Sequence, residues 1–412
     1  MKRITIVSGI QLSDNPRVVK EAATLANAGY DVEVLCSLLK PADQDRNLRI
    51  AGLHSFRVRR VVDASRCGLV NRMSWQWRRL RRRLSLSASR LTGGESVFQL
   101  GYAAHGLLKE CLLNPADLYS IHLPQAMWVG AQLISRGAKV SVDMEDWYSE
   151  DFRQEDLVTA PLRLLRSNES AVLNGAAFSA TTSSAMSRSL VEHYGCRPPL
   201  VLHNSFRLSE RSIHALPPHQ SQTVKRLTRV GWVSQVIGPD RGLEQLVAAT
   251  HYLKRPIEIH LTGRLRSGME DLLSSGLHSA SRIVFQEQVP HEELLALMQT
   301  YDIGFAGELA ENRSRDLTVT NKLLHYFLAG IPAVCSDTQG QLEICRQAPE
   351  ATRVYAQRDP ASLAAAIDSL VENPEILNSA KQAAWDAGST TFCWEANEDR
   401  LLDAVRGAIG DP

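Results

Sequence analysis

The sequence predicts an α/β protein made of two doubly wound, parallel-sheet domains. The chain has 412 residues, which is more than one ordinary hydrophobic core accommodates, so two domains are expected. Short apolar runs typical of buried strands alternate with amphipathic helical patterns along both halves of the sequence. A polar stretch at residues 206–226, with two adjacent prolines, separates the halves and is predicted to be a linker.

The first half opens with a strand–loop–helix–strand unit. The apolar run at residues 4–8 predicts a buried strand, and a loop follows over residues 9–15. The apolar spacing then predicts a helix over residues 16–28 and another strand over residues 31–36. The loop lacks the G-x-G-x-x-G pattern of dinucleotide-binding proteins, which argues against an NAD-dependent enzyme.

Two later strands of the first half end at polar residues. Residues 117–122 predict a strand that ends at His122, and residues 139–144 predict a strand that leads into an acidic loop. Open α/β sheets bind ligands at the carboxyl ends of their strands, so His122 is a candidate functional residue, although a lone histidine is often structural. The acidic loop contains Asp143, Glu145, Asp146, Glu150 and Asp151. These carboxylates could bind a metal, pair with basic residues or meet a hydroxylated substrate, and their spacing is too unspecific to predict a metal.

The second half repeats the α/β alternation. Strands are predicted at residues 228–233, 257–261, 282–285 and 302–305, with helical patterns between them. Two successive α/β domains with a cleft between them are the architecture that this pattern supports.

The most informative stretch is residues 318–337, TVTNKLLHYFLAGIPAVCSD. It predicts a helix that Gly330 ends as a C-cap residue, followed by a buried strand. Thr318, Thr320 and Asn321 offer capping oxygens and free backbone N–H groups ahead of the helix. A helix N-terminus attracts anions, and Lys322 adds a positive charge beside it. The alternative is an ordinary capped helix packed on a sheet.

Composition and charge exclude several classes of protein. The formal net charge is only +1, which argues against a dedicated nucleic-acid binder. Residues 1–205 hold 26 Lys and Arg against 19 Asp and Glu, and the remainder holds 20 against 26, so the halves carry +7 and −6. The seven cysteines are scattered without metal or disulfide spacing, which suits reduced thiols in the cytoplasm. We find neither a signal-peptide pattern nor a membrane-spanning run of about 18 apolar residues.

Residues 72–90, RMSWQWRRLRRRLSLSASR, contain seven arginines interleaved with apolar residues. On a helix, Trp77, Leu80 and Leu84 share one face and the arginines cover the rest. Such a segment suits the surface of an anionic membrane, to which each cation contributes roughly 1 kcal/mol. The alternatives are a solvated helix that covers its own domain and a nucleic-acid contact, for which no recognition motif is present.

Seven segments occur in the order found in one enzyme family. They are NPRVVKEAATLANAGYDVEVL, YSIHLPQ, VDMEDWYSED, VLHNS, RVGWVSQVIGPDRGLEQLVAA, TNKLLHYFLAGIPAVCSDTQGQLEI and FCWEANEDRLL. Together they cover nearly the whole chain, which resembles the GT-B glycosyltransferases, specifically the family-4 retaining type that uses nucleotide sugars. The resemblance implies a hexosyltransferase (EC 2.4) that acts on a glycan or lipid-linked acceptor in cell-surface polysaccharide or glycolipid biosynthesis.

The resemblance also implies a domain layout. Residues 1–205 would form a Rossmann-like acceptor-binding domain and residues 227–385 a Rossmann-like nucleotide-sugar-binding domain, joined by the linker at 206–226. Residues 386–412 would form a C-terminal helix that crosses back to the first domain. The nucleotide sugar would be a substrate, so no cofactor and no metal is expected, and nucleic acid is not an expected partner. The protein would be cytoplasmic and peripheral on the inner face of the membrane.

Specific residues are implied by their places in these motifs. The catalytic residues would be His122, Arg241 and Lys322. Arg241 and Lys322 would bind the donor diphosphate, and His122 would lie near the transferred sugar. The donor-binding residues would be Gly9, Gly231, Arg241, Gly263, Val289, Thr320, Asn321, Lys322 and His325. The acceptor-side candidates are Asn15, Arg17, Glu145 and Asp146. For Arg17 the alternative is a solvated surface charge.

Three positions depart from the family pattern. The family commonly carries two glutamates eight apart in its donor segment, and these positions are Leu317 and His325 here. Trp232 stands where an arginine is common, and Glu145 stands where the acidic loop usually has histidine. A catalytically silent protein that binds nucleotide or glycan, or that partners an active transferase, is therefore the alternative function. Sugar-nucleotide epimerisation is a weaker alternative, since the carboxylates that it needs have no clear place here.

Overall fold

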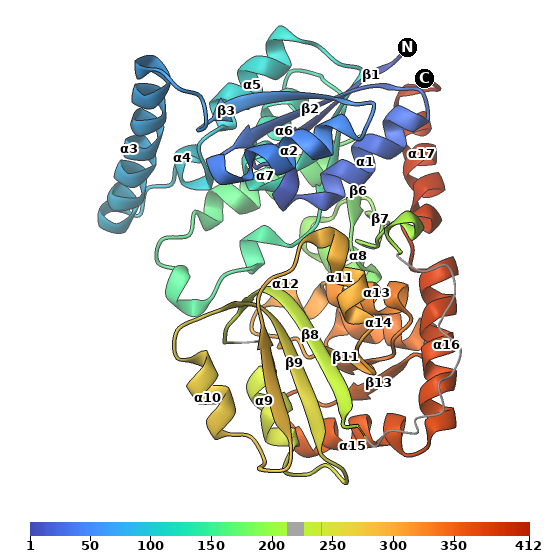
Figure 1. The fold of residues 1–412 in the computed structure, drawn as a ribbon. Helices are drawn as coiled ribbons and strands as arrows, with labels where there is room; N and C mark the ends of the chain where they lie inside the picture. The colour runs from blue at the N-terminus through green and yellow to red at the C-terminus, as the bar shows by residue number, and fades with distance from the viewer. Residues whose placement is uncertain (212–225, 240) are drawn as a thin grey trace. The chain divides into compact units, whose positions relative to one another are not determined.

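The structure is a computed structural model that describes residues 1–211, 226–239 and 241–412. The chain divides into two compact units (Figure 1). Unit 1 contains residues 1–182, 186–202 and 398–412, and unit 2 contains residues 183–185 and 203–397. Each unit holds one parallel sheet with helices, as the alternating pattern of the sequence predicts.

Unit 1 is built on a seven-stranded sheet in the order β3-β2-β1-β4-β5-β6-β7, and every pairing is parallel. Its strands are β1 (Arg3–Ser8), β2 (Asp31–Leu38), β3 (Arg57–Asp63), β4 (Leu118–His122), β5 (Val140–Met144), β6 (Phe178–Thr181) and β7 (Leu200–Val201). The strand order reverses between β1 and β4. In open α/β sheets this switch point opens a crevice at the carboxyl ends of the strands, where ligands bind.

The longer helices of unit 1 connect these strands. They are α1 (Pro16–Asn27), α2 (Gln44–Gly52), α3 (Leu69–Thr92), α5 (Ala104–Leu113), α6 (Leu123–Ile134), α7 (Leu162–Gly175) and α8 (Ser184–Tyr194), the last of which starts in unit 2. Helix α1 begins at Pro16, after Asn15 accepts a hydrogen bond from the Val18 N–H as its N-cap. This cap fixes the start of α1 beside the end of β1.

Unit 2 is built on a six-stranded parallel sheet in the order β10-β9-β8-β11-β12-β13. Its strands are β8 (Thr228–Ile237), β9 (Ile257–Leu265), β10 (Arg282–Gln286), β11 (Ile303–Ala306), β12 (Ala333–Ser336) and β13 (Thr352–Tyr355). Its helices are α9 (Leu243–Ala249), α10 (Met269–Ser275), α11 (His291–Met298), α12 (Arg313–Leu317), α13 (Asn321–Ala329), α14 (Gln339–Gln347), α15 (Pro360–Val371) and α16 (Pro374–Thr390). The switch point lies between β8 and β11, so this unit repeats the logic of unit 1.

The C-terminal residues pack within unit 1. Helix α17 (Glu395–Ile409) receives a hydrogen bond of 2.6 Å from Thr24 Oγ1 to Glu398 Oε1. Lys139 Nζ donates to the Ala408 carbonyl over 2.8 Å, and Tyr30 donates to the Gly410 carbonyl over 2.9 Å. Residues of α1 and of the connections just before β2 and β5 thus hold the end of the chain.

Several local expectations differ from the structure. The predicted linker starts inside unit 2, because Phe206 is buried in the core of that unit and pairs with Cys393. Residues 212–225 of the predicted linker lie outside the described residues. Strand β8 continues four residues beyond its predicted end at Val233, because a register shift lets it stay paired with β9.

The stretch at residues 318–337 forms the predicted helix α13 and strand β12, and Gly330 ends the helix with φ +71°. The expected side-chain caps are absent. Thr320 occupies the N-cap position without a capping hydrogen bond, and Thr318 Oγ1 instead donates to the Ser314 carbonyl. Ser314 lies in α12, a short helix just before Thr318 that the sequence pattern did not predict. Its carbonyl gives the Thr318 hydroxyl an acceptor that precedes it in the chain, away from α13.

Candidate functional site

A buried charged cluster lies at the switch point of unit 1. His122 ends β4 and is fully buried. Its Nε2 lies 2.9 Å from Glu21 Oε2 on α1, and its Nδ1 lies 3.1 Å from Glu145 Oε1 in the loop after β5. Ser120, two residues earlier on the same face of β4, donates to the other oxygen of Glu21 over 2.5 Å. The ring of His122 is therefore clamped between two carboxylates.

Glu145 and Arg17 extend this cluster. Asn15 Nδ2 donates to the same Oε1 of Glu145 over 3.2 Å, so the N-cap of α1 also holds the acidic loop. The Arg17 guanidinium binds both oxygens of Asp143 over 2.5 and 3.0 Å. A third bond of 3.0 Å runs from Arg17 Nη1 to the Leu202 carbonyl. Arg17 is 1% exposed, so its charge is directed into the protein and not toward solvent.

The ionisation states follow from this geometry. Burial alone would lower the pKa of His122, but the charge of Glu21 and the hydrogen bonds to Glu145 and Glu21 raise it to about 10. Burial favours the neutral forms of Glu21 and Glu145, yet the charge of His122 and its hydrogen bonds keep the pKa of each carboxyl below its usual value. His122 is therefore an imidazolium that donates from both nitrogens. Glu21, His122 and Asp143 each have one atom of a kind that can bind a metal, and these atoms lie within 4.8 Å of one another. All three side chains already take part in ion pairs, so we assign no metal to them.

A second charged cluster lies at the switch point of unit 2. Glu308, in the loop after β11, is 5% exposed and accepts from two cations. Lys322 Nζ, in the first turn of α13, contacts Glu308 Oε1, and Arg241 Nη1, just before α9, lies 3.4 Å from Glu308 Oε2. The two cations that the sequence predicts to bind a diphosphate thus meet on one carboxylate. Two cations and one anion leave a net positive charge, which suits a phosphate-bearing ligand.

Lys322 also lies over an aromatic ring. Its ammonium lies 5.6 Å from the centroid of the buried Trp232 ring, which places a cation–π contact where the family usually has arginine. Ser336 Oγ donates to the backbone carbonyl of Glu308 over 2.6 Å and fixes the loop. Burial alone would raise the pKa of Glu308, but the charges of Lys322 and Arg241 lower it, so Glu308 remains a carboxylate.

The glycines of the predicted donor site are closely packed. A Cβ on Gly9 would lie 2.5 Å from Gln125 Nε2, and one on Gly231 would lie 1.9 Å from the ring of Tyr301. Gly263 has φ +152°, and its Cβ would lie 2.5 Å from a backbone oxygen of β8. Their neighbours in the protein already account for the absence of side chains at these positions.

The remaining predicted residues are spread along unit 2 and the acidic loop. Val289 follows β10 at the edge of the sheet, and Thr320 and Asn321 stand at the start of α13. His325 is 6% exposed and stacks on Phe206 with ring centroids 3.2 Å apart. Asp146 follows Glu145 and is partly exposed.

Two residues that anchor these clusters were not singled out from the sequence. Glu21 lies in the middle of a helix whose apolar residues carry the pattern, and Glu308 lies in an irregular loop. Glu308 belongs to none of the seven segments, and Glu21 lies in the first of them at a position to which the resemblance assigns no role. The available signal for Glu21 was its position one helical turn after Arg17, on the same face of α1.

Helix α3 carries the arginine-rich segment and projects away from the sheet of unit 1 (Figure 1). Its exposed apolar residues recur at helical spacing and are 45–86% exposed. They are Leu69, Val70, Met73, Trp77, Leu80, Leu84 and Leu91. Arg78 and Arg82 donate to Tyr102, and Arg81 lies over the Phe98 ring, so these three arginines hold α3 to the following segment. Across the residues that the structure describes, we find no helix with the length and hydrophobicity needed to span a bilayer.

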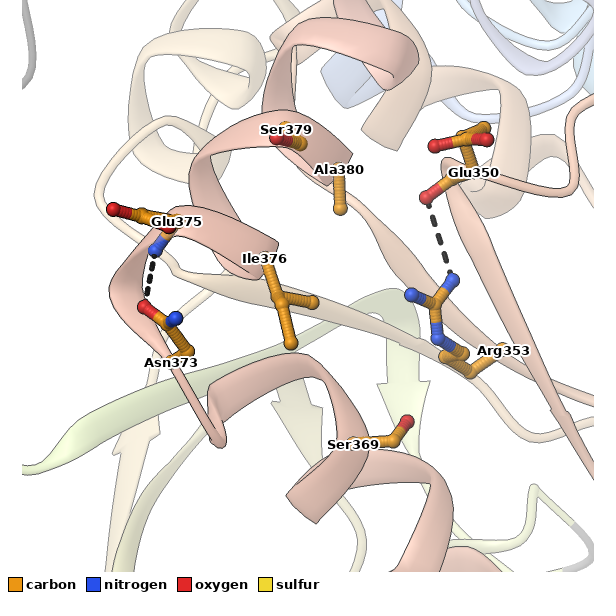
Figure 2. Close-up of a pocket in the computed structure, with 8 residues that line it drawn as sticks. All are labelled: Glu350, Arg353, Ser369, Asn373, Glu375, Ile376, Ser379 and Ala380. Carbon is orange, nitrogen blue, oxygen red and sulfur yellow. Dashed lines mark hydrogen bonds between the residues drawn. The ribbon is translucent and has the colours of Figure 1, made fainter.

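A shallow pocket on unit 2, with a volume of about 490 Å³, is separate from these clusters (Figure 2). Residues before β13 and on α15 and α16 line it, and Arg353 is engaged with the backbone carbonyls of Pro349, Glu350 and Thr352. These residues lie toward the amino end of β13. Ligands of α/β sheets bind at the opposite, carboxyl end, so we assign no function to this pocket.

Comparisons with known proteins agree with this architecture. The family model described as "Glycosyl transferase 4-like domain" matches residues 15–205, and the model described as "Glycosyl transferases group 1" matches residues 228–373. Among curated protein sequences, the search finds no match.

Solved structures share the whole fold at low sequence identity. Sucrose-phosphate synthase from Thermosynechococcus elongatus has a TM-score of 0.71 at 15% identity, over 98% of each chain. The TarM protein of S. aureus, in complex with fondaparinux, α-GlcNAc-glycerol and UDP, has a TM-score of 0.69 at 7% identity, over 99% of this chain and 100% of that one. Anabaena HepE in complex with UDP and glucose has a TM-score of 0.68 at 14% identity, over 98% and 99%.

Two Rossmann-like units, each with a charged cluster at its switch point, define a GT-B protein. The two family models together cover most of the chain and narrow this class. The chain belongs to the GT-B glycosyltransferases of the family-4 type (EC 2.4), as the sequence predicts.

Proposed function

We propose that this enzyme transfers a hexosyl group, with retention, from a nucleoside diphosphate sugar to a glycan or lipid-linked acceptor. The pathway would be the synthesis of a cell-surface polysaccharide or glycolipid. The observation that carries this proposal is the convergence of Arg241 and Lys322 on Glu308 at the switch point of unit 2. Both cations belong to segments that resemble the family's phosphate-binding elements.

The chemistry explains why two cations are needed. When the sugar leaves, negative charge grows on the nucleoside diphosphate while the sugar becomes oxocarbenium-like. Arg241 and Lys322 would bind that diphosphate and stabilise the developing charge. In front-face attack the donor phosphate accepts the proton of the acceptor hydroxyl, so a catalytic pair of carboxylates is not required. The nucleotide sugar is a substrate, and the proposal includes no cofactor and no metal.

The other predicted residues have proposed places in this reaction. In unit 1, Gly9 would approach the donor diphosphate and His122 would lie near the transferred sugar. The acceptor-side residues would be Asn15, Arg17, Glu145 and Asp146. The proposed donor contacts in unit 2, besides the two cations, are Gly231, Gly263, Val289, Thr320, Asn321 and His325. His325 would meet a ribose hydroxyl if its stacking on Phe206 opens.

The test is nucleotide binding and nucleotide-sugar turnover. UDP is the first probe, because the HepE and TarM structures contain it, and a panel of nucleotide sugars with a crude membrane acceptor follows. We expect nucleoside diphosphate release from one donor, and a loss of UDP affinity of about tenfold or more in Lys322→Met or Arg241→Met. The matched control is Lys254→Met, an exposed cation elsewhere on unit 2. No binding of any nucleotide and no release from any donor would refute the proposal.

A catalytically silent nucleotide- or glycan-binding protein is the second candidate. Two observations favour it: Leu317 is 1% exposed where the family has a glutamate, and His325 is packed against Phe206 where the family has the second one. If the unmodified protein binds UDP but turns over no nucleotide sugar in the presence of a membrane acceptor, this candidate is selected over the enzyme.

An anionic membrane surface is the proposed partner of residues 72–90 in α3. The helix contains seven arginines and no acidic residue, and it exposes an apolar stripe that includes Trp77. This combination fits a helix that lies in the lipid headgroup region. The protein would then be cytoplasmic and peripheral, on the inner face of the membrane.

Vesicle binding tests this partner. Arg79 and Arg83 make none of the contacts described above between α3 and its unit, so Arg79→Ser/Arg83→Ser should leave the fold intact. At roughly 1 kcal/mol for each cation, the pair should weaken partitioning onto phosphatidylserine vesicles about thirtyfold. Binding should also weaken as salt is added. Arg46→Ser/Arg49→Ser, on the exposed side of α2, is the charge-matched control. Equal partitioning of the α3 variant and the control would refute the membrane contact.

A further inference from the structure

We infer that Glu145 is the residue of the unit 1 cluster that contacts substrate, through a hydrogen bond from a sugar hydroxyl to its Oε2. Glu21 and His122 are positioning residues that hold Glu145 in place. This inference rests on the proposed function, because the substrate is taken to be a sugar. It gives Glu21 a positioning role, and it changes His122 from a residue that would lie near the transferred sugar to a positioning residue.

The two oxygens of Glu145 have different surroundings. Oε1 accepts from both His122 Nδ1, at 3.1 Å, and Asn15 Nδ2, at 3.2 Å. Within residues 1–211, 226–239 and 241–412, we find no hydrogen bond to Oε2. The Glu145 side chain is 15% exposed, whereas that of His122 is fully buried. One oxygen is therefore held by the protein and the other is open to a ligand.

His122 cannot itself reach a ligand in this arrangement. Both of its ring nitrogens are occupied by carboxylates, and no part of its side chain meets solvent. Its contribution is to orient Glu145 with a charge-assisted hydrogen bond. Glu21 supports His122 on the other side and is itself held by Ser120.

The charges of the cluster select the chemistry of the ligand. The carboxyl groups of Glu21, Asp143 and Glu145 outnumber the cations Arg17 and His122 by one. Burial raises the pKa of Asp143, but the pKa of Glu145 is lowered, so the open position presents a carboxylate oxygen. A phosphate would be repelled from Glu145 Oε2, whereas a neutral hydroxyl can donate to it. The ligand class is thus the sugar hydroxyls of the donor or the acceptor, and the diphosphate is excluded from this position.

Glu145 would bind the hydroxyl without removing its proton. Burial favours its neutral form, but the hydrogen bond and charge of His122 lower the pKa of Glu145 below its usual value. A carboxylate with a lowered pKa is a weak base and a good hydrogen-bond acceptor. This role is compatible with front-face attack, in which the donor phosphate takes the proton.

Glu145→Gln tests the contact. The amide oxygen can still accept from His122 and Asn15, while the open position changes from a carboxylate oxygen to an NH2 group. We expect kcat/KM to fall about tenfold or more, with UDP binding and thermal unfolding unchanged. A raised KM for the acceptor would assign the hydroxyl to the acceptor, and a raised KM for the donor would assign it to the donor sugar. Unchanged kinetics would overturn the inference, whereas a wild-type protein that neither binds UDP nor turns over would instead refute the proposed function.

Glu21→Gln tests the positioning roles with a pH profile. Burial alone lowers the pKa of an imidazole, so the loss of one carboxylate should bring the pKa of His122 down from about 10. The protonated ring makes the stronger, charge-assisted hydrogen bond to Glu145, and a neutral ring donates to it only in the Nδ1–H tautomer. Activity should therefore fall in part as pH rises through this lower pKa, while the wild type keeps its activity in the same range. Arg17 and Asp143 face the cluster from α1 and β5 and are unchanged in the variant. The control is Glu150→Gln, whose carboxylate pairs with Arg166 at the surface. A profile identical to that of the wild type would overturn the positioning role.

Discussion

Replacing Arg17 by methionine should destabilise unit 1 strongly. The Arg17 guanidinium is 1% exposed and binds both oxygens of Asp143, whose side chain is 6% exposed. Methionine preserves much of the volume of the arginine stem but leaves the Asp143 carboxylate buried without its cation. Removing one partner of a buried ion pair typically costs about 3–5 kcal/mol, because the remaining charge is desolvated and unpaired. The lost hydrogen bond to the Leu202 carbonyl adds to this cost.

A double-mutant cycle separates the pair from its surroundings. In Arg17→Met/Asp143→Leu both charges are gone, and a hydrophobic replacement of a buried ion pair is often close to neutral. We therefore expect the double variant to recover at least about half of the loss in Arg17→Met. His122 and Glu145 lie in the same cluster, so the coupling energy includes their adjustment.

The assay is urea denaturation together with hydrogen exchange of the β5 amides. The exchange measurement reports on unit 1 alone, which matters because a two-unit chain need not unfold in one step. Arg211→Met, an arginine of unit 2 that lies over Trp385, is the control and should leave β5 protection unchanged. If Arg17→Met lowers the opening free energy of β5 by less than about 1 kcal/mol, or if the double variant is less stable than the single one, the buried pair does not have the energetic role assigned to it.

Three further predictions concern unit 2. Gly242→Ala should destabilise the turn before α9, since Gly242 has φ +70° and a Cβ there would lie 2.2 Å from the Gly307 carbonyl oxygen. Both thermal stability and UDP affinity should fall, and a variant that matches the wild type in both would contradict this. Gly330→Ala should cost about 1 kcal/mol in urea denaturation, because the residue ends α13 with φ +71°, and a stabilised variant would show the cap to be dispensable. The ion pairs of Glu308 should contribute stability that is fully present above its unfolded-state pKa of about 4.3 and is lost as pH falls through its lower folded-state pKa. The loss of stability in acid should therefore be smaller in Glu308→Gln than in the wild type. An identical dependence of stability on pH would contradict the lowered pKa.

The fold could be predicted from the sequence because its signals are local and repeated. Buried parallel strands appear as short apolar runs, such as residues 4–8, and the helices between them carry apolar spacing and clear ends such as Gly330. What the sequence could not predict depends on contacts between distant residues. The extension of β8 to Ile237 requires β9 as its partner, and α12 is a short helix of polar composition, with no apolar stripe to reveal it.

The site could be predicted only for residues to which a motif assigns a role. Lys322 and Arg241 stand in segments with a recognisable pattern, and the structure brings both to one carboxylate. Glu308 could not be predicted, since its role exists only because the loop after β11 folds beside α13. Glu21 is similar: it is buried by β4, which is about a hundred residues away in the sequence, and an isolated acidic residue in a helix normally faces solvent.

The two charged clusters show why the charge of each half of the chain is a poor guide to its chemistry. Residues 1–205 carry a net charge of +7, yet the buried cluster of unit 1 has one more carboxylate than cations. The excess of arginine in this half lies largely on α3, which contributes seven at the surface. The second half is net negative, yet its cluster at the switch point has two cations for one carboxylate. The Coulomb energy of buried groups depends on distances of a few ångströms and on a low local dielectric, so we expect these small clusters to outweigh the surface charge in selecting the proposed ligands. Such a division suits a sugar transferase, which must bind the neutral hydroxyls of a sugar in one place and a diphosphate in another.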